Sequence, residues 1–472
     1  MNPPLDDAEK GREFADRVLR GDELPPEFRD EVPPECTDEA LALRFSEDHA
    51  HDLRYVAAWG KWLEWSGTRW KPDVTLATFD RARFVCRRAS SSCDNIKVAA
   101  KVASASTVAA VERLAKADRK HAATVEQWDA DPWLLNTPGG TVDLRTGKMR
   151  RHLPADHMTK ITAVAPGGEC PLWHQFLAKV TGNNIEMQAY LKRMAGYALT
   201  GSIREHALFF AYGTGANGKG VTINTLTGIM GDYAAVAGIE TFTASQSDRH
   251  PTDLAMLRGA RLVTAQETEE GRRWAESRIK AMTGGDPITA RFMRQDFFTF
   301  EPTFKLLIAG NHRPGLRNVD EAIRRRFNLL PFAVKIPPAE RDLDLPEKLK
   351  AEWPGILKWA IEGCLEWQQI GLAAPAAVLD ATEEYLTAED ATAGWLGECC
   401  IQDPALHTSS SQLYASWKAW AEAAGEHAGS QKGFSQKLIA KGFEAQRFSA
   451  GTAGFLGLGI KPDSTLSDRF GD

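Results

Sequence analysis

Apolar residues along the chain follow two kinds of spacing, and each predicts a different element. Intervals of three and four residues, typical of one face of a helix, occur in 38–45, 75–127, 170–177, 186–200 and 345–372. Continuous apolar runs bounded by polar or turn residues indicate buried strands, and they lie in 207–212, 261–270, 304–309 and 328–334. Strands that alternate with helices favour an α/β protein built on a parallel sheet.

The segments on either side of these strands have a different character. Residues 1–50 are rich in Pro, Asp and Glu, and we expect 1–37 to be a flexible leader. Tryptophans at 59, 62, 65 and 70, expected to pack in a core, precede helices broken near Ser90 and a small β element at 131–147. After a linker at 371–377 come predicted helices at 378–399, 410–424 and 432–441 and apolar runs near 448 and 455–460. This last arrangement resembles a winged helix. The expected domains are therefore the leader (1–37), a mostly helical domain (38–165), a P-loop core (166–372) and a winged-helix-like domain (373–472).

A glycine-rich stretch connects the first predicted strand to the helix after it, and reads Gly213-Thr-Gly-Ala-Asn-Gly-Lys-Gly220. Its Gly-x-x-x-x-Gly-Lys spacing is that of a P-loop, in which backbone N–H groups converge on a triphosphate and the lysine reaches the β- and γ-oxygens. A glycine turn that binds nothing is the alternative, but the strand-to-helix context favours nucleotide binding. The predicted ATP site consists of Gly213, Thr214, Gly215, Ala216, Asn217, Gly218, Lys219, Gly220, Val221 and Thr222.

Metal binding at this loop cannot use the hydroxyl that a P-loop usually provides. Gly220 stands where a P-loop usually has the Ser or Thr that binds Mg²⁺, so water or Thr222 would have to replace that hydroxyl. The strand predicted over 261–270 ends in Glu267 and Glu269, where an NTPase holds Mg²⁺ and polarises the attacking water. We assign Glu267 to that role, although a strand ending in exposed glutamates would look the same. The expected cofactors are ATP and Mg²⁺, with Glu267 and Thr222 as metal ligands.

Other polar residues follow the remaining strands. Asn311 comes directly after the third strand, where an amide can sense a γ-phosphate and orient water. Arg325 and Arg326 precede the fourth strand, and guanidinium groups stabilise a transferring phosphoryl group, often from a neighbouring subunit. A hairpin predicted over 288–301 carries Arg291 and, at its tip, Arg294. These two arginines could follow a DNA backbone or could simply be solvated.

Composition narrows the classes of protein. A chain of 472 residues, 43% hydrophobic and 25% charged, is expected to be a soluble protein of several domains. It has no apolar run of about 18 residues and no basic-then-apolar leader, so we expect a cytoplasmic protein without a membrane partner. Seven cysteines without a Cys-x-x-Cys pair argue against a zinc ribbon and a disulfide framework. The net charge is −6, yet residues 271–326 hold twelve Lys and Arg against six Asp and Glu, which suits a channel lining or a phosphate site.

Taken in order, these motifs resemble those of the superfamily-3, AAA+-related DNA helicases, and in particular the helicase part of the poxvirus-type and phage-satellite primase-helicases. The motifs are the glycine loop, Glu267-Thr-Glu269, Thr283-Gly-Gly-Asp-Pro-Ile288 with Arg291, Phe304 to Asn311, and Arg325-Arg326 before Leu330-Pro-Phe332. Upstream, residues 134–147 and 196–200 are similar to the family's amino-terminal helicase-associated domain. The likeness covers about residues 38–460.

The resemblance implies a hexameric ring with ATP sites between subunits. Lys219, Glu267 and Asn311 would come from one subunit and an arginine finger, Arg325 or Arg326, from the next. The hairpin near Arg294 would move along one DNA strand in the central channel, in the family's case 3′ to 5′. The chain starts where the family's primase domain would already have ended, so we expect no priming activity and a separately encoded primase as a partner. Such proteins usually belong to phages, plasmids or mobile islands.

Three functions are therefore open at this point. The first is an ATP-dependent, ring-forming DNA helicase that replicates a mobile element. The second is an ATP-dependent origin-binding or loading protein without processive unwinding. Gly220 and the winged-helix-like segment are compatible with this function. The third, a small-molecule P-loop kinase, is disfavoured by the arginine triplet 324–326 and by the lack of an evident acceptor site.

Overall fold

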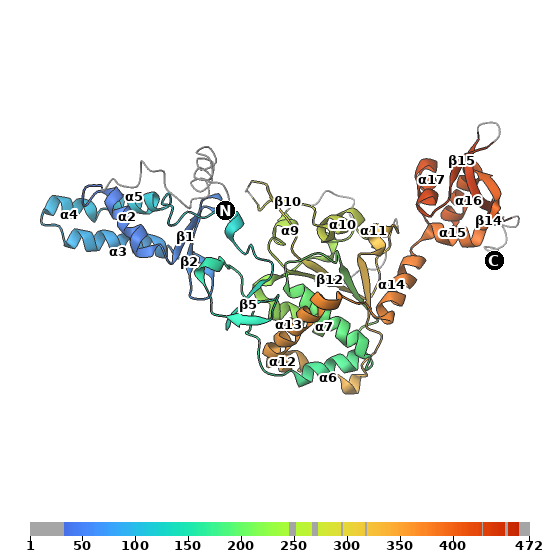
Figure 1. Cartoon of the computed structure of the whole chain (residues 1–472), viewed down its shortest axis with the longest axis horizontal. Helices are drawn as coiled ribbons and strands as arrows, with labels where there is room; N and C mark the ends of the chain where they lie inside the picture. The colour runs from blue at the N-terminus through green and yellow to red at the C-terminus, as the bar shows by residue number, and fades with distance from the viewer. Residues whose placement is uncertain are drawn as a thin grey trace, which may run out of the picture.

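The computed structural model describes residues 33–244, 252–266, 272–293, 296–316, 319–426, 428–448 and 452–461. Its elements form an elongated molecule with three parts (Figure 1). A helical unit lies toward the N-terminus, an α/β body occupies the middle, and a small unit lies toward the C-terminus. The predicted P-loop belongs to the middle body.

The first unit consists mainly of helices, as predicted, with the expected break after residue 91. Its helices are α2 (Asp38–His49), α3 (Ala77–Ser91), α4 (Ile96–Val102) and α5 (Ala105–Ala115). The side chains of Thr37, Asn95 and Ser104 accept backbone N–H bonds at the starts of α2, α4 and α5, which stabilises those ends. Phe45 and Val111 belong to the apolar cluster that joins the helices.

Two small antiparallel sheets follow, the first beside these helices and the second packed against the middle body, whose apolar cluster includes Leu135 and Val142. They contain β1 (Leu53–Val56), β2 (Lys61–Trp65) and β3 (Trp70–Pro72), then β4 (Leu134–Thr137), β5 (Gly140–Asp143) and β6 (Lys148–Arg150). Trp70 is fully buried, its Nε1 donates to the Pro154 carbonyl at 2.9 Å, and its ring meets Trp128 edge-on. Core packing is thus confirmed for Trp62 and Trp70, whereas Trp59 and Trp65 are only half-buried.

The middle body is organised by a parallel sheet, so the predicted fold class is confirmed. Its strand order is β13-β7-β12-β9-β8, and every neighbouring pair is parallel. The strands are β7 (Leu208–Tyr212), β8 (Ala234–Val236), β9 (Leu262–Gln266), β12 (Lys305–Gly310) and β13 (Phe327–Pro331). Every residue of β12 is buried, which explains why its sequence is a continuous apolar run. The short edge strand β8 was not predicted.

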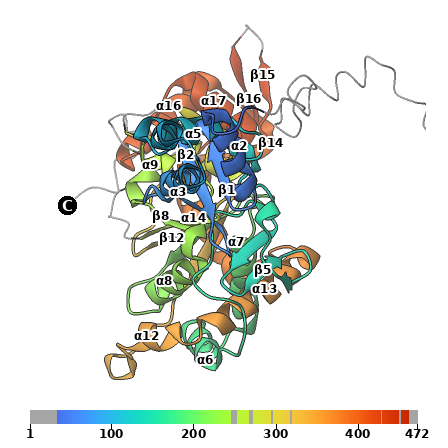
Figure 2. The same cartoon turned by 90° about the vertical axis from the view of Figure 1, so that its left-hand side faces the viewer.

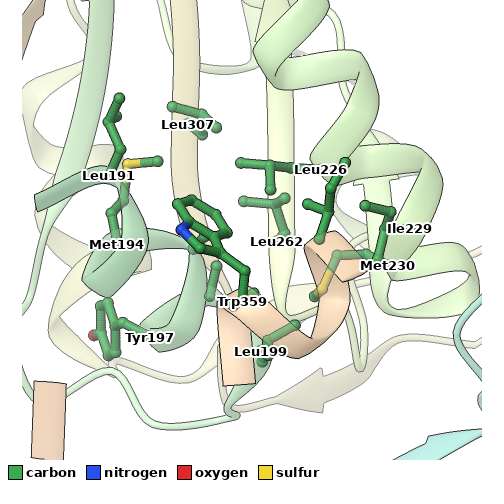
Figure 3. Packing of buried hydrophobic residues seen from close by; sticks show 14 of the residues in the cluster. Leu191, Met194, Tyr197, Leu199, Leu226, Ile229, Met230, Leu262, Leu307 and Trp359 are labelled. Atoms are coloured by element: carbon green, nitrogen blue, oxygen red, sulfur yellow. The ribbon is translucent and has the colours of Figure 1, made fainter. Parts of the chain in front are cut away.

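Helices cover both faces of this sheet. On one side lie α6 (Pro171–Val180), α7 (Ile185–Leu199), α12 (Leu345–Lys350) and α13 (Trp353–Ile370), with α8 (Lys219–Met230) following β7 (Figures 1 and 2). Trp359 of α13 packs among Met194, Leu226 and Leu262, which come from α7, α8 and β9 (Figure 3). Helices α7 and α13 approach so closely that a Cβ added at Gly196 would collide with the backbone of Cys364.

The other face carries α9 (Thr252–Ala255), α10 (Glu276–Gly284) and α11 (Glu321–Arg324), together with the predicted hairpin, β10 (Ile288–Ala290) and β11 (Phe298–Phe300) (Figure 1). A second apolar cluster joins these elements to the sheet. Within it, Trp274 meets Phe210 and Phe327 edge-on, at centroid distances of 5.5 and 5.7 Å. This contact ties the residues before α10 to β7 and β13.

Two segments predicted to be helical each contain two helices, and the structure corrects the second of these predictions. Residues 345–372 form two helices, and Pro354 lies in the first turn of the second, where its missing N–H costs nothing. The helix predicted over 378–399 is also two helices, α14 (Ala376–Ala388) and α15 (Ala391–Cys399), because Asp390 caps α15 by accepting from the Ala393 N–H. Helix α14 packs on β13, where Leu329 N donates to Thr382 Oγ1 at 2.9 Å. The domain boundaries stay predictions, and α14 lies beyond the expected boundary at 372 yet contacts the core.

The last unit has the predicted helices and hairpin. It contains α15, β14 (Cys400–Ser409), α16 (Ser410–Ala423), α17 (Gln431–Ala440), β15 (Ala445–Arg447) and β16 (Ala453–Ile460), and its sheet order is β14-β16-β15. Trp395, Trp417 and Phe434 form its apolar centre. Strand β14 was not predicted, because most of its residues are exposed and Asp403-Pro404 interrupts its apolar pattern.

Candidate nucleotide-binding site

The predicted P-loop lies at the carboxyl edge of the sheet, because β7 ends at Tyr212 and α8 begins at Lys219. Gly215, Ala216 and Gly218 have φ angles of 89°, 51° and 87°, which fold the loop back on itself. The backbone N–H groups of 214–218 donate to no other atom of the described residues, and no side chain caps α8. Successive unpaired N–H groups at a helix N-terminus attract an anion.

The segment after β13 holds this loop in place. Phe332 N donates to the Tyr212 carbonyl and Ile336 N to the Ala216 carbonyl, both at 2.9 Å. Asn217, which is 3% exposed, donates from Nδ2 to the Phe332 carbonyl at 2.9 Å. Glycine is required at 213, because a Cβ there would collide with the Phe332 carbonyl and with the Asn217 amide. The loop is therefore shaped before any ligand binds.

Lys219 is buried beneath the loop and has neutral partners. Its Nζ donates to the Gly213 carbonyl at 2.6 Å, to Asn311 Oδ1 at 3.3 Å and to Asn217 Oδ1 at 3.4 Å. Burial lowers the pKa of Lys219, because the ammonium group loses water without gaining a carboxylate among the described residues. A phosphate placed here would supply the missing negative charge.

The ends of two neighbouring strands lie at the same edge. Gly310 of β12 is paired with Tyr212, and Ala309 is paired with Gln266 of β9. Asn311, the expected γ-phosphate sensor, thus follows β12 next to the loop and touches Lys219. Glu267, the expected catalytic carboxylate, and Glu269 lie outside the described residues. The structure brings Lys219, Asn217 and Asn311 together and leaves the position of Glu267 untested.

The expected metal ligand Thr222 is 3% exposed in the first turn of α8, and its hydroxyl donates to the Gly218 carbonyl at 3.0 Å. Among the described residues, Gly220 leaves open space beside β9, because the nearest atom beyond its own helix to a Cβ added there would be Gln266 Oε1, at 3.9 Å. Gln266 in turn donates from Nε2 to Asn224 Oδ1 at 2.8 Å. The sequence analysis did not identify the amides of Asn224 and Gln266. The available signal was that residues 220 and 224 share a helix face and that Gln266 ends a strand beside that helix.

The oxygen donors that the structure describes here are compatible with Mg²⁺. Among the described ranges, no three His, Cys, Asp or Glu residues could hold a metal together. Mg²⁺ prefers oxygen ligands and keeps several waters, and in nucleotide sites it also binds the phosphates. The oxygens of Thr222 and Gln266 beside the loop suit such an ion, which would supply charge neutralisation at the phosphates.

The two expected finger arginines have different environments. Arg326 is 5% exposed, and it donates from Nε to Thr283 Oγ1 at 2.9 Å and from Nη1 to the Ala322 carbonyl at 2.7 Å. Arg325 is exposed, and its guanidinium forms no hydrogen bond or ion pair within the part of the chain that the structure describes. Arg324 pairs with Glu383 of α14 at 2.9 Å. Of the triplet, Arg325 alone is both exposed and unpaired in that part.

These arginines precede β13 and lie at the amino end of the strands, opposite the loop. Phe327 of β13 is paired with Leu208, and Leu208 N donates to the Arg326 carbonyl at 2.7 Å. Strand β7 then runs for five residues before the loop begins, a rise of about 16 Å at ~3.3 Å per residue. Arg325 is therefore separated from the loop of its own chain by the length of the strand.

The predicted hairpin ends in apolar as well as basic side chains. Arg291 lies over the Phe297 ring at 4.8 Å, and Phe292 stacks on Phe298 at 5.5 Å. Met293 and Phe297 are 74% and 59% exposed. Arg294, expected at the tip, lies outside the described residues. The described part of the tip thus presents Arg291 together with large apolar groups.

A parallel sheet with a glycine loop at its carboxyl edge, followed by a helix, defines the class of the middle body, a P-loop α/β core. Two family models match the chain: "D5 N terminal like" over residues 42–182 and "Family of unknown function (DUF5906)" over residues 211–326. Together with the viral relatives described next, they confirm the resemblance drawn from the motifs. The chain is a distant relative of the superfamily-3 primase-helicases.

Similar proteins come from large DNA viruses. "Putative helicase L207/L206" of Acanthamoeba polyphaga mimivirus is 25% identical over 319 residues, which cover 62% of this chain and 33% of the relative. "Putative helicase 022R" of Frog virus 3 is 25% identical over 275 residues, covering 53% and 28%. "Putative primase C962R" of African swine fever virus is 25% identical over 214 residues, covering 43% and 22%. The chain thus spans about a third or less of the length of these relatives.

A solved structure titled "The A form apo structure of NrS-1 C terminal region-CTR" covers 90% of this chain and all of its own, with 10% identity and a TM-score of 0.48. At that similarity it has no bearing on the site. With regard to membranes, none of the helices in the described ranges is long and apolar enough to cross a bilayer.

Proposed function

We propose that this chain is an ATP-dependent, ring-forming DNA helicase that acts in the replication of a phage, plasmid or other mobile element. Relatives named as helicases and primases support a helicase-like role in replication. One observation carries the finer proposal: the loop with Lys219 and the exposed Arg325 lie at opposite edges of one sheet. A single chain cannot bring them together without rearranging that sheet.

Head-to-tail association of copies would bring the two opposite edges, one from each copy, next to each other. Such a contact would place the amino edge of one sheet, with Arg325, against the loop of the next copy. Heterologous contacts of this kind close into a ring when the rotation allows. In each interface Lys219 would bind the β- and γ-phosphates, Asn311 would orient water, and Glu267 would accept its proton. Six copies are expected from the family resemblance.

The hairpin supplies the proposed DNA contact. Aromatic side chains stack on nucleic-acid bases without sequence preference, and arginines attract the phosphates. Phe297 is exposed beside Arg291, so the described part of the hairpin offers one group of each kind. The net positive charge of residues 271–326, which include this hairpin, favours the same partner.

A second function is kept because of the C-terminal unit. Helix α17 carries exposed Lys432, and β15, in the neighbouring hairpin, ends in exposed Arg447. A helix and a β-hairpin of this kind can hold duplex DNA, so the chain could instead load on an origin without unwinding processively. Gly220 also fits a site that binds ATP more readily than it hydrolyses it.

The test uses the purified full chain on a forked duplex and on single-stranded DNA. We expect ATP turnover that single-stranded DNA stimulates, and strand separation that requires ATP. Lys219→Ala and Glu267→Gln should abolish both, while Lys432→Ala, far from the loop in sequence, should leave turnover intact. ATP-dependent duplex binding without strand separation would favour the loading protein, and absence of ATP turnover would contradict the helicase.

A further inference from the structure

Gly220 removes a hydroxyl from the loop, and the structure shows which group faces the space that remains. Residues 220 and 224 are one turn apart on α8 and share a face. Strand β9 passes this face, and because side chains alternate along a strand, Thr264 and Gln266 point to the same side. Thr227 Oγ1 donates to Thr264 Oγ1 at 3.4 Å, and Gln266 Nε2 donates to Asn224 Oδ1 at 2.8 Å.

The contact with Asn224 orients the Gln266 amide. Because Nε2 is engaged by Asn224, the carbonyl oxygen Oε1 is turned toward Gly220, 3.9 Å from where a Cβ would stand. No other heavy atom of the described residues, apart from near neighbours in the chain and helix, lies within 4 Å of that point. A hydroxyl on residue 220 and the oxygen of Gln266 would therefore point into the same small space beside the loop.

We propose that Gln266 Oε1 takes over the task of the missing hydroxyl and binds the hydrated Mg²⁺ that accompanies the nucleotide, with Asn224 as the positioning residue. The inference rests on the proposed ATP site. An amide carbonyl is a hard, neutral oxygen donor of the kind that Mg²⁺ accepts alongside water and phosphate. Asn224 acts only through Gln266, since its own oxygen is occupied by the Gln266 amide group.

The test measures binding rather than turnover. The affinity of the full chain for the non-hydrolysable analogue AMP-PNP is determined by calorimetry in millimolar Mg²⁺ and in EDTA, and the ratio of the two dissociation constants is the Mg²⁺ gain. We expect Gln266→Ala to lower this gain about tenfold, the lower end of the loss seen when groups that support a metal site are removed. Its affinity in EDTA and its melting temperature should not change. Asn224→Ala should lower the gain less, and Gln436→Ala, an exposed glutamine on α17, not at all.

Recovery of the Mg²⁺ gain in a double variant tests the inference most directly. Gly220→Ser in the Gln266→Ala background restores the usual hydroxyl and should recover most of the gain, since residue 220 has room for a side chain. A full Mg²⁺ gain in Gln266→Ala would overturn the inference, as would a gain that Gly220→Ser fails to restore. If the wild-type chain bound no AMP-PNP in either buffer, the proposed function itself would fail. Binding with a gain independent of Gln266 would remove only this inference.

Discussion

Arg325 and Arg326 are adjacent in sequence, yet their replacement by alanine should have opposite consequences. Arg326→Ala removes two hydrogen bonds from a buried guanidinium, to Thr283 and to the Ala322 carbonyl. Bonds to charged groups contribute about 1.5–3 kcal/mol each, so the free energy of unfolding should fall by about 3–6 kcal/mol. Arg325→Ala removes an exposed side chain without such bonds, and should change that free energy by less than about 0.5 kcal/mol.

For ATP turnover the order of the two variants should be reversed, because Arg325→Ala should lose more turnover than Arg326→Ala. An arginine finger is worth about 10³–10⁵ in the rate of phosphoryl transfer, or ~4–7 kcal/mol of the barrier. Arg325→Ala should therefore abolish measurable DNA-stimulated ATP turnover while nucleotide binding persists. Arg325→Lys should recover little of it, because an ammonium cannot reproduce the planar fork of a guanidinium. Under conditions where it is folded, Arg326→Ala should keep most of its turnover.

Two assays separate these effects: urea denaturation followed by fluorescence for the free energy of unfolding, and steady-state ATP turnover at saturating single-stranded DNA. Arg324→Ala, which breaks the pairs with Glu383 and, at 4.0 Å, with Asp390, serves as the control for turnover within the triplet. Full turnover in Arg325→Ala would refute the assignment. Loss of turnover in Arg326→Ala at unchanged stability would transfer the role of the finger to Arg326.

Further predictions concern the loop, the hairpin and the first unit. Lys219→Met should leave the melting temperature of the nucleotide-free chain unchanged or higher, because a buried cation with neutral partners is removed, but should abolish its rise on adding ATP. Phe297→Ala should weaken single-stranded DNA binding by about 1–3 kcal/mol, measured by fluorescence anisotropy, whereas full affinity would contradict base stacking. Burial lowers the pKa of His121 from its ordinary 6.5, so its folded state binds fewer protons than the unfolded state below that pH. Stability should therefore fall as the pH drops below about 6.5, by at most ~1.4 kcal/mol per pH unit, and denaturation of His121→Asn should show a flatter profile.

The parts of the fold that were predictable are those with a strong apolar pattern, namely strands buried on both sides and helices with one apolar face. Strands β7 and β12 were located to within a residue, because continuous apolar runs in a chain of this composition are typical of buried strands. Strands β8 and β14 were missed, since a three-residue edge strand and a mostly exposed strand carry little apolar signal. The break between α14 and α15 depends on the Asp390 cap, and an Asp inside an apolar periodicity did not reveal it.

The candidate site was predictable to the extent that strand order determines it. Lys219 and Asn311 follow parallel strands, so their meeting at one edge could be expected before the structure. The difference between Arg325 and Arg326 could not, because it depends on Thr283, a residue 43 positions away from Arg326 in the chain. The same holds for the Gln266 amide, whose orientation comes from Asn224 on a neighbouring helix.

The central claim is that ATP is hydrolysed between two copies of the chain, with Lys219 from one and Arg325 from the other. Mixing Lys219→Ala with Arg325→Ala chains tests it directly, since neither variant alone can form a complete interface. In a 1:1 mixture that assembles at random, about a quarter of head-to-tail interfaces would pair an intact Lys219 with an intact Arg325. The account predicts that DNA-stimulated ATP turnover returns to about that fraction of the wild-type rate. A mixture as inactive as its separate components, beside a wild-type chain that turns over fully as a monomer, would contradict it.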